Sequence, residues 1–193
     1  MDDLVHLNPP AALTAILDRT RALAFSMPSE PRTGAMLRTL AASKPGGRLM
    51  ELGTGTGLST AWLLDGMDER ARLITIDVDP ETQDVAREIL GRDPRLEIVT
   101  ADAAVFLRHQ TGATFDLIFA DAMPGKYEFL DQALALLRPG GLYVIDDLLP
   151  QENWPENHAW RVPSLIADLA ARENFRIVSL AWSSGLVVVA RHH

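Results

Sequence analysis

The chain has 193 residues, with 18 Lys and Arg against 26 Asp and Glu, which gives a formal net charge of −8. This length suits one domain with a full hydrophobic core. There is no cysteine, which excludes disulfides, thiolate metal sites and a cysteine nucleophile. Because basic residues are outnumbered and form no stripe, we expect no nucleic-acid partner.

Neither end of the chain predicts targeting to a membrane. No apolar run approaches the ~18 residues that a membrane-spanning helix needs, so we expect no membrane partner. The first residues, Met1-Asp2-Asp3, carry acid where a signal peptide carries base. We therefore expect a cytoplasmic protein.

The first part of the chain reads as a helical leader. Apolar spacing predicts helices over 10–25 and 31–43, and Pro31 stands at a favourable first helical position. We expect a single domain over 1–193, with the leader over 1–45 and an α/β core over 46–193.

From Arg48 onward, short apolar runs rich in β-branched residues alternate with helical patterns, which is typical of βαβ units and a parallel sheet. The helical pattern is clearest over 129–137, before the stop signal of residues 138–141. The predicted strands of this region are 48–52, 72–77, 96–99, 115–120 and 142–146.

The pattern changes after the fifth strand. A loop leads to a helix predicted over 163–172, and two strands are predicted over 175–182 and 186–191. Three residues are too few for a parallel crossover, so the last strand should run antiparallel to its predecessor. The sequence therefore predicts a mostly parallel seven-stranded sheet with an antiparallel last strand and helices on both faces.

Five acidic residues, Glu51, Asp77, Asp102, Asp121 and Asp146, lie at or just after the carboxyl ends of successive predicted strands. Ligands of open α/β sheets bind at that edge. An acidic pocket there suits a cationic ligand, a ribose diol or a metal ion. The alternative is that each strand simply ends where the chain meets water, and for any single residue the two explanations stay open.

A glycine-rich turn, Glu51-Leu52-Gly53-Thr54-Gly55-Thr56-Gly57-Leu58-Ser59, follows the first predicted strand and opens a helix. Asp77 lies twenty residues beyond Gly57, a distance that suits a carboxylate holding ribose hydroxyls. A dinucleotide turn reads G-x-G-x-x-G, whereas here the third glycine comes one residue early. Glu51 would also repel a pyrophosphate and attract an amino group, so the turn favours S-adenosylmethionine over NAD.

With these features the sequence resembles the small-molecule O-methyltransferases of the catechol and caffeoyl-coenzyme A type, from about Met27 to the C-terminus. The resemblance implies a Rossmann-like class I methyltransferase fold and methyl transfer to a hydroxyl of a small aromatic or diol molecule. The motifs that carry it are the turn above and residues 27–34, 75–80, 101–103, 115–121, 136–141 and 184–188.

The resemblance also implies a cofactor site. Glu51, Gly53 and Ser59 would hold the methionine part of S-adenosylmethionine, and Asp77 would hold the ribose. For the two methionines of the set, an ordinary core position is the alternative. The full expected set is Met27, Glu51, Gly53, Thr54, Gly55, Ser59, Asp77, Val78, Asp102, Ala103, Asp121 and Met123, with Met27 near the sulfonium and Asp102, Ala103 and Met123 bordering the adenine.

The family's metal site would fall on Asp121, Asp146 and Asp147. Three oxygen ligands suit a hard divalent cation such as Mg²⁺, Mn²⁺ or Ca²⁺, which could bind a vicinal diol and lower the pKa of its hydroxyl. The family usually has Asn where this chain has Asp147. The change leaves two possibilities open, a metal site with one more charge or a site of changed purpose.

A second departure concerns the catalytic lysine, because Pro124 stands at the position where the family has it. Lys126 lies two residues further on, followed by Tyr127, which matches the family. Lys126 either reaches back into the site or points at solvent. The expected catalytic residues are Asp121, Lys126 and His158, the last as a base in the acceptor loop over 151–160.

Three functions stay open: a metal-assisted O-methyltransferase, a metal-independent methyltransferase acting on another small nucleophile, and a non-catalytic S-adenosylmethionine-binding protein. The resemblance also implies a homodimer formed through the leader helices.

Overall fold

The structure is a computed structural model that describes residues 7–151, 154 and 158–192. Its elements in chain order are α1 (Leu13–Ala22), α2 (Pro31–Ala42), β1 (Arg48–Leu52), α3 (Leu58–Gly66), β2 (Arg72–Asp77), α4 (Pro80–Leu90), β3 (Leu96–Thr100), α5 (Ala103–His109), β4 (Phe115–Ala120), α6 (Met123–Lys126), α7 (Leu130–Ala135), β5 (Leu137–Ile145), α8 (Arg161–Ala170), β6 (Phe175–Leu180) and β7 (Leu186–Arg191).

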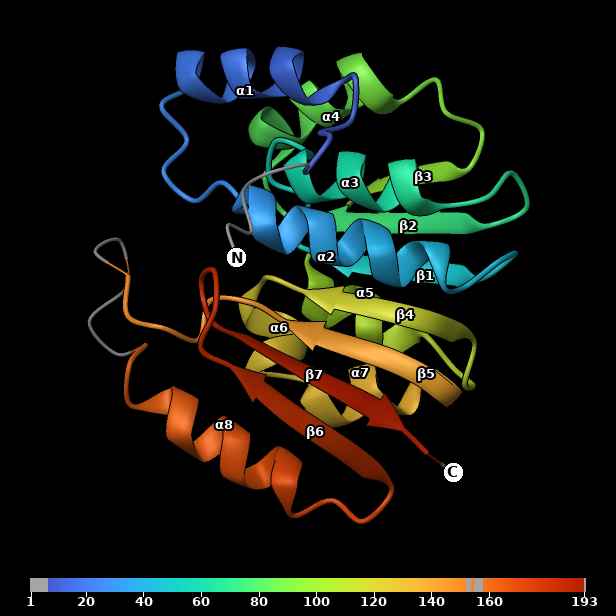
Figure 1. Cartoon of the computed structure of the whole chain (residues 1–193), viewed down its shortest axis with the longest axis vertical. Helices are drawn as coiled ribbons and strands as arrows, with labels where there is room; N and C mark the ends of the chain where they lie inside the picture. Colours follow the sequence, from blue (N-terminus) through green and yellow to red (C-terminus); the bar gives the residue numbers. More distant parts are fainter. Residues whose placement is uncertain (1–6, 152–153, 155–157, 193) are drawn as a thin grey trace.

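The seven strands form one sheet in the order β3-β2-β1-β4-β5-β7-β6 (Figure 1). The first five strands pair in parallel, and β7 pairs antiparallel with both β5 and β6. The predicted fold class is confirmed. The order reverses beside β1, which pairs with β2 on one side and β4 on the other, and such a reversal opens a crevice at the carboxyl edge.

Successive residues of the central strands point to opposite faces of the sheet, and each face carries its own core. Met50 and Ile118 pack with α5, α7 and α8, whereas Leu49 and Leu117 pack with α1 to α4. Helices therefore cover both faces, as Figure 1 shows. This alternation explains why the strands read as nearly continuous apolar runs.

The leader helices belong to the same layer as α3 and α4. The α2 helix lies against α3 so closely that a Cβ on Gly34 would fall 2.2 Å from Cδ1 of Trp62. The guanidinium of Arg38 lies 4.9 Å from the centroid of the same ring. The leader thus closes the core on this face.

One element begins earlier than the sequence pattern predicted. Helix α7 ends at Ala135, and β5 starts at Leu137, so residues 138–141 lie within a strand rather than in a stop signal. Leu137 pairs with Phe115, and the register then shifts before Leu142 pairs with Leu117. The irregularity accommodates Pro139, which cannot donate a ladder hydrogen bond.

Among the described residues, no helix combines the length and the apolar character that crossing a membrane would require.

Candidate functional site

A cavity of about 600 Å³ opens at the carboxyl ends of β1, β2, β3 and β4. The strand ends meet there because their ladders stay in register, with Leu52 opposite both Ile76 and Ala120. Its lining includes most of the residues predicted as a site, namely Met27, Gly53, Thr54, Gly55, Asp77, Val78, Asp102, Ala103, Asp121, Met123, Lys126, Asp147 and His158. Glu51, Ser59 and Asp146 are not in this lining.

The glycine turn approaches the end of β4 more closely than any side chain would allow. Gly53 has a φ of +102°, and a Cβ there would lie 2.8 Å from the carbonyl oxygen of Asp121. The amide of Gly55 donates to Oδ2 of Asp77 at 2.8 Å, and the amide of Asp79 donates to Oδ1 at 3.0 Å. The turn and the Asp77 carboxylate therefore hold each other in place.

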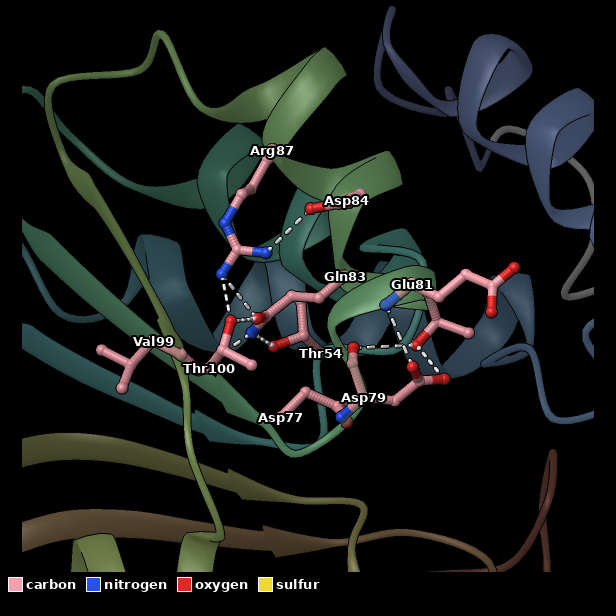
Figure 2. A network of polar contacts seen from close by, with 10 residues as sticks. Thr54, Asp77, Asp79, Glu81, Gln83, Asp84, Arg87, Val99 and Thr100 are labelled. Carbon is pink, nitrogen blue, oxygen red and sulfur yellow. Dashed lines mark hydrogen bonds and ion pairs between the residues drawn. The ribbon is translucent and has the colours of Figure 1, made fainter.

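A buried network fixes the turn from behind (Figure 2). Gln83 of α4 donates from Nε2 to Oγ1 of Thr54 and to the carbonyl of Val99, each at 3.0 Å. Its Oε1 accepts from Thr100 at 2.6 Å and from Arg87 at 2.7 Å. All the hydrogen-bonding capacity of the amide is used, so Gln83 ties α4, β3 and the turn together.

Glu51, the first residue of the glycine-rich turn, is fully buried. Its Oε2 accepts hydrogen bonds from Thr60 and, at 2.6 Å, from Thr75. Oε1 has no hydrogen-bond partner among the described residues. Burial raises the pKa of Glu51 to about 7, and the hydroxyls of Ser59, Thr60 and Thr75 partly offset this. Ser59 is buried as well, and its hydroxyl acts on the Glu51 carboxylate.

The two methionines of the predicted cofactor set are not core residues. Met27 is 58% exposed and Met123 36% exposed, and both line the cavity together with Val78, which is 69% exposed. Exposed apolar side chains around a cavity are what an apolar ligand surface would cover. Asp102 has a structural duty as well, because its Oδ1 caps α5 by accepting from the amide of Ala104 at 2.7 Å.

The predicted catalytic residues line the same cavity. Lys126 is 3% exposed, and its Nζ lies 3.7 Å from Oδ1 of Asp121. His158 is 6% exposed, and its Nε2 lies 2.9 Å from the hydroxyl of Tyr127 and 3.3 Å from the carbonyl of Asp147. The Trp154 ring stacks on His158 with centroids 4.3 Å apart. Lys126 thus points inward rather than at solvent.

Burial and charge shape the titration of these groups. Burial, followed by the nearby Asp146 carboxylate, raises the pKa of Asp121 well above its ordinary value. Burial lowers the pKa of His158, and the Lys126 ammonium lowers it further, so the imidazole is neutral at pH 7. Burial also raises the pKa of Tyr127 to about 12, which keeps its hydroxyl protonated.

The three predicted metal ligands lie near one another, but Asp121 and Asp146 already have other partners. Asp146 turns toward the β6–β7 hairpin, where its Oδ1 accepts from the hydroxyl of Ser184 and from the amide of Asp147, the latter at 2.7 Å. The Lys126 ammonium already stands beside Asp121. No group of three or more His, Asp or Glu side chains in the described part of the chain could hold a metal ion. This donor set does not fit the expected cation.

Sequence reasoning missed part of the lining, including Phe25, Pro28, Ser29 and Thr82. Pro28 and Ser29 belong to the segment that resembles the family, which was a usable signal. Phe25 and Thr82 gave none, because a lone aromatic or hydroxyl residue has no spacing that marks it. Trp160, the last residue of the expected acceptor loop, is 65% exposed and lies outside the lining. Of the acceptor loop over 151–160, residues 152–153 and 155–157 lie outside the described residues.

The fold and the cavity define an α/β protein with a candidate ligand site at the switch point of its sheet. Residues 50–148, about half of the chain, match the family described as "Methyltransferase domain". The chain belongs to that family.

Curated relatives come from mycobacteria and are named "Putative O-methyltransferase". One from Mycobacterium sp. (strain KMS) is 34% identical over 150 residues, covering 74% of this chain and 68% of that protein. One from Mycolicibacterium vanbaalenii is 38% identical over 120 residues, covering 60% of this chain and 53% of that protein. The match thus spans about half the length of the latter.

Solved structures share the fold over nearly the whole chain. The O-methyltransferase TomG from Streptomyces achromogenes, in complex with S-adenosylmethionine, has a TM-score of 0.84 at 23% identity and covers 99% of this chain and 94% of its own. An O-methyltransferase from Bacillus cereus, in complex with S-adenosylhomocysteine, has a TM-score of 0.84 at 23% identity and covers 97% and 93%.

Proposed function

We propose that this chain transfers a methyl group from S-adenosylmethionine to a hydroxyl of a small molecule. The observation that carries the proposal is one cavity that is lined both by Gly53, Gly55 and Asp77 of the expected cofactor set and by Asp121, Lys126 and His158. Membership of the methyltransferase family supports it, as do the cofactor complexes of proteins with the same fold.

The residues of the turn fit this cofactor. Gly53 and Gly55 bring bare backbone to the cavity wall, and a Cβ at position 53 would collide with the carbonyl oxygen of Asp121. Glu51, buried behind that wall with no partner for Oε1 among the described residues, is the acid that would attract the amino group of the cofactor. Asp77 accepts hydrogen bonds from the ribose hydroxyls. When bound, the cofactor supplies a methyl group on a sulfonium, and Met27 covers that region. Val78, Asp102, Ala103 and Met123 enclose the adenine.

Beside Asp121, Lys126 and His158, the protein's part is to place the acceptor oxygen and take up its proton. The Lys126 ammonium stabilises the oxygen as charge develops, and the neutral His158 imidazole accepts the hydroxyl proton. Trp154 and His158 form an aromatic wall that suits a planar acceptor. No step of the proposed transfer uses a divalent metal, because the Lys126 ammonium already stands beside Asp121 and Oδ1 of Asp146 is hydrogen-bonded to Ser184.

Calorimetric titration with S-adenosylmethionine, followed by mass spectrometry of a panel of phenols and alcohols incubated with protein and cofactor, tests the proposal. We expect binding and a gain of about 14 Da on at least one acceptor class, the mass of the CH₂ added by methyl transfer. Pro124 stands where the family has its catalytic lysine, and this favours a second candidate, a non-catalytic cofactor-binding protein. Binding without transfer to any acceptor would favour that candidate, and absence of binding would contradict both.

Homodimer formation, the absence of a nucleic-acid partner and a cytoplasmic location stay predictions. Light scattering of the purified chain checks the first.

A further inference from the structure

The buried ammonium of Lys126 stands at the acidic end of the cavity. Its Nζ lies 3.7 Å from Oδ1 of Asp121, and both residues line the cavity together with Asp147. Burying a charge is costly unless an opposite charge accompanies it. The distance is that of an ion pair, longer than a hydrogen bond, so the N–H donors of the ammonium are not committed to Asp121.

The backbone imposes this position. In the turn α6, Gly125 has a φ of +89°, and its carbonyl accepts a hydrogen bond from the buried hydroxyl of Tyr143 at 2.7 Å. Its amide donates to the carbonyl of Glu128 at 2.6 Å. Pro124 adds a fixed φ to the same turn. Hydrogen bonds hold both the amide and the carbonyl of Gly125, so the backbone of α6 is fixed and directs Lys126 into the cavity.

The neighbouring acids are arranged for an internal cation. Oδ1 of Asp146 accepts from the hydroxyl of Ser184 and from the amide of Asp147, and Asp146 lies outside the cavity lining, although its charge still acts on Asp121. Asp121 is paired with the ammonium. Of the acids that would otherwise share a divalent ion, Asp146 is thus hydrogen-bonded to Ser184 and Asp121 is ion-paired with Lys126.

We infer that the Lys126 ammonium is the permanent substitute for a divalent cation in this chain, so that the acceptor is held through one oxygen and needs no second, chelating hydroxyl. The inference deepens the proposed function and rests on it for the substrate. It names the substrate class as compounds with a single reactive hydroxyl, such as monohydric phenols, because an ammonium is a point charge without an open coordination shell.

The transfer step balances without a metal. The acceptor oxygen forms a bond to the methyl carbon while the bond from that carbon to sulfur breaks, and the sulfonium becomes a neutral thioether. The hydroxyl proton goes to the imidazole of His158. The ammonium gains and loses nothing, because it stabilises the developing charge on the oxygen through space.

The first test measures Mn²⁺ binding by electron paramagnetic resonance and needs no acceptor. We expect no binding to the wild-type chain at millimolar Mn²⁺. Lys126→Met removes the internal cation and should strengthen Mn²⁺ affinity by about tenfold or more, since unpaired carboxylates favour a cation. Lys126→Met combined with Asp121→Asn should abolish that gain. Lys126→Arg keeps the charge and should stay without Mn²⁺, which controls for a disturbed fold.

The chain has two lysines, so Lys44→Met provides a matched control that removes the same charge elsewhere. Lys44 is bonded to the carbonyl of Gly140, away from the cavity. This variant should bind no Mn²⁺. Binding of Mn²⁺ by the wild type, or failure of folded Lys126→Met to gain affinity, would overturn the inference.

The second test compares acceptors in the presence of a chelator. Methylation should survive excess EDTA, and a monohydric phenol should react within about tenfold of the matched catechol in kcat/KM. A requirement for added metal, or strict dependence on the second hydroxyl, would overturn the inference. If no acceptor is methylated although S-adenosylmethionine binds, the proposed function fails while the Mn²⁺ result still decides the role of Lys126.

Discussion

At the scale of single residues, Glu51 combines complete burial with an incomplete set of hydrogen bonds. One carboxylate oxygen accepts from two threonine hydroxyls, and the other has no partner in the described part of the chain. An ionised group in this position is costly unless a cation is near. A positive charge near Glu51, at the start of the glycine-rich turn, would therefore stabilise its ionised form.

This preference makes stability depend on pH. The pKa of Glu51 is raised from 4.5 to about 7 in the folded chain, so between these values the folded state holds a proton that the unfolded state has released. Stability from this group is therefore present below pH 4.5 and falls as pH rises to about 7. The stability of Glu51→Gln relative to the wild type should be greater at pH 8 than at pH 4.5, by up to about 3 kcal/mol. Urea denaturation at both pH values measures this, and an equal difference at both would contradict it.

Asp77 is the residue on which the cofactor assignment depends. Asp77→Ala removes two charge-assisted hydrogen bonds to a ribose and should weaken S-adenosylmethionine binding by about 1.5–3 kcal/mol. Calorimetry measures the dissociation constant. Asp84→Ala is a suitable control, because Asp84 of α4 forms an exposed ion pair with Arg87 and does not line the cavity. Equal affinity of the Asp77 variant, with an intact fold, would remove Asp77 from the site.

At the scale of elements, the short turn α6 decides the chemistry of the cavity. The sequence placed Lys126 near the predicted strand end but left its direction open. That direction follows from a left-handed Gly125 and from a tyrosine on β5, eighteen residues further along the chain. Neither the positive φ of Gly125 nor its contact with Tyr143 produces a recognisable pattern in the sequence, so neither could be predicted from it.

Gly125→Ala tests how tightly this turn is held. A Cβ there would lie 2.4 Å from Cδ1 of Leu52 and 2.9 Å from the Tyr143 hydroxyl, in a backbone conformation that already disfavours alanine. We expect a loss of about 2–4 kcal/mol in stability. Gly140→Ala is the matched control, because Gly140 also has a positive φ but a Cβ there meets nothing within 4 Å. It should lose about 1 kcal/mol, from backbone strain alone. Equal losses in the two variants would show that packing around Gly125 is unimportant.

At the scale of the whole molecule, the alternation of strand and helix patterns predicted the sheet, its mixed direction and the common edge of the acidic residues. It could not predict which acids face the cavity. Asp146 follows β5 as expected, yet its carboxylate bonds to Ser184 in a hairpin that is remote in the sequence. The start of β5 was also missed, because residues 138–141 have the composition of a helix stop although they lie within β5, at an irregularity between two residues that pair with β4.

The leader and the C-terminal hairpin meet through a chain of hydroxyls. Thr33 of α2 lies 2.9 Å from the Ser183 hydroxyl, which in turn donates to Oε2 of Glu30 at 2.9 Å. Thr33 is fully buried. Thr33→Val keeps the shape of the side chain but removes the hydroxyl that lies within hydrogen-bond distance of Ser183 and Ser184. We expect a loss of about 1–2 kcal/mol in stability, measured by thermal unfolding. Thr39→Val is the control, since Thr39 is bonded within its own helix near the surface. An unchanged melting temperature for Thr33→Val would mean that the hydroxyl chain does not join the two ends.

The close contact between α2 and α3 gives the molecule a built-in optical reporter. The indole of Trp62 is 2% exposed, and it is sealed by the backbone at Gly34 and by the side chain of Arg38. An indole shielded from water emits at shorter wavelength than a hydrated one, so release of the leader should shift its emission to the red. With Trp154, Trp160 and Trp182 replaced by Phe, a single emitting ring would remain, and its colour would report the docking of α2 on the sheet second by second while the rest of the fold stays intact.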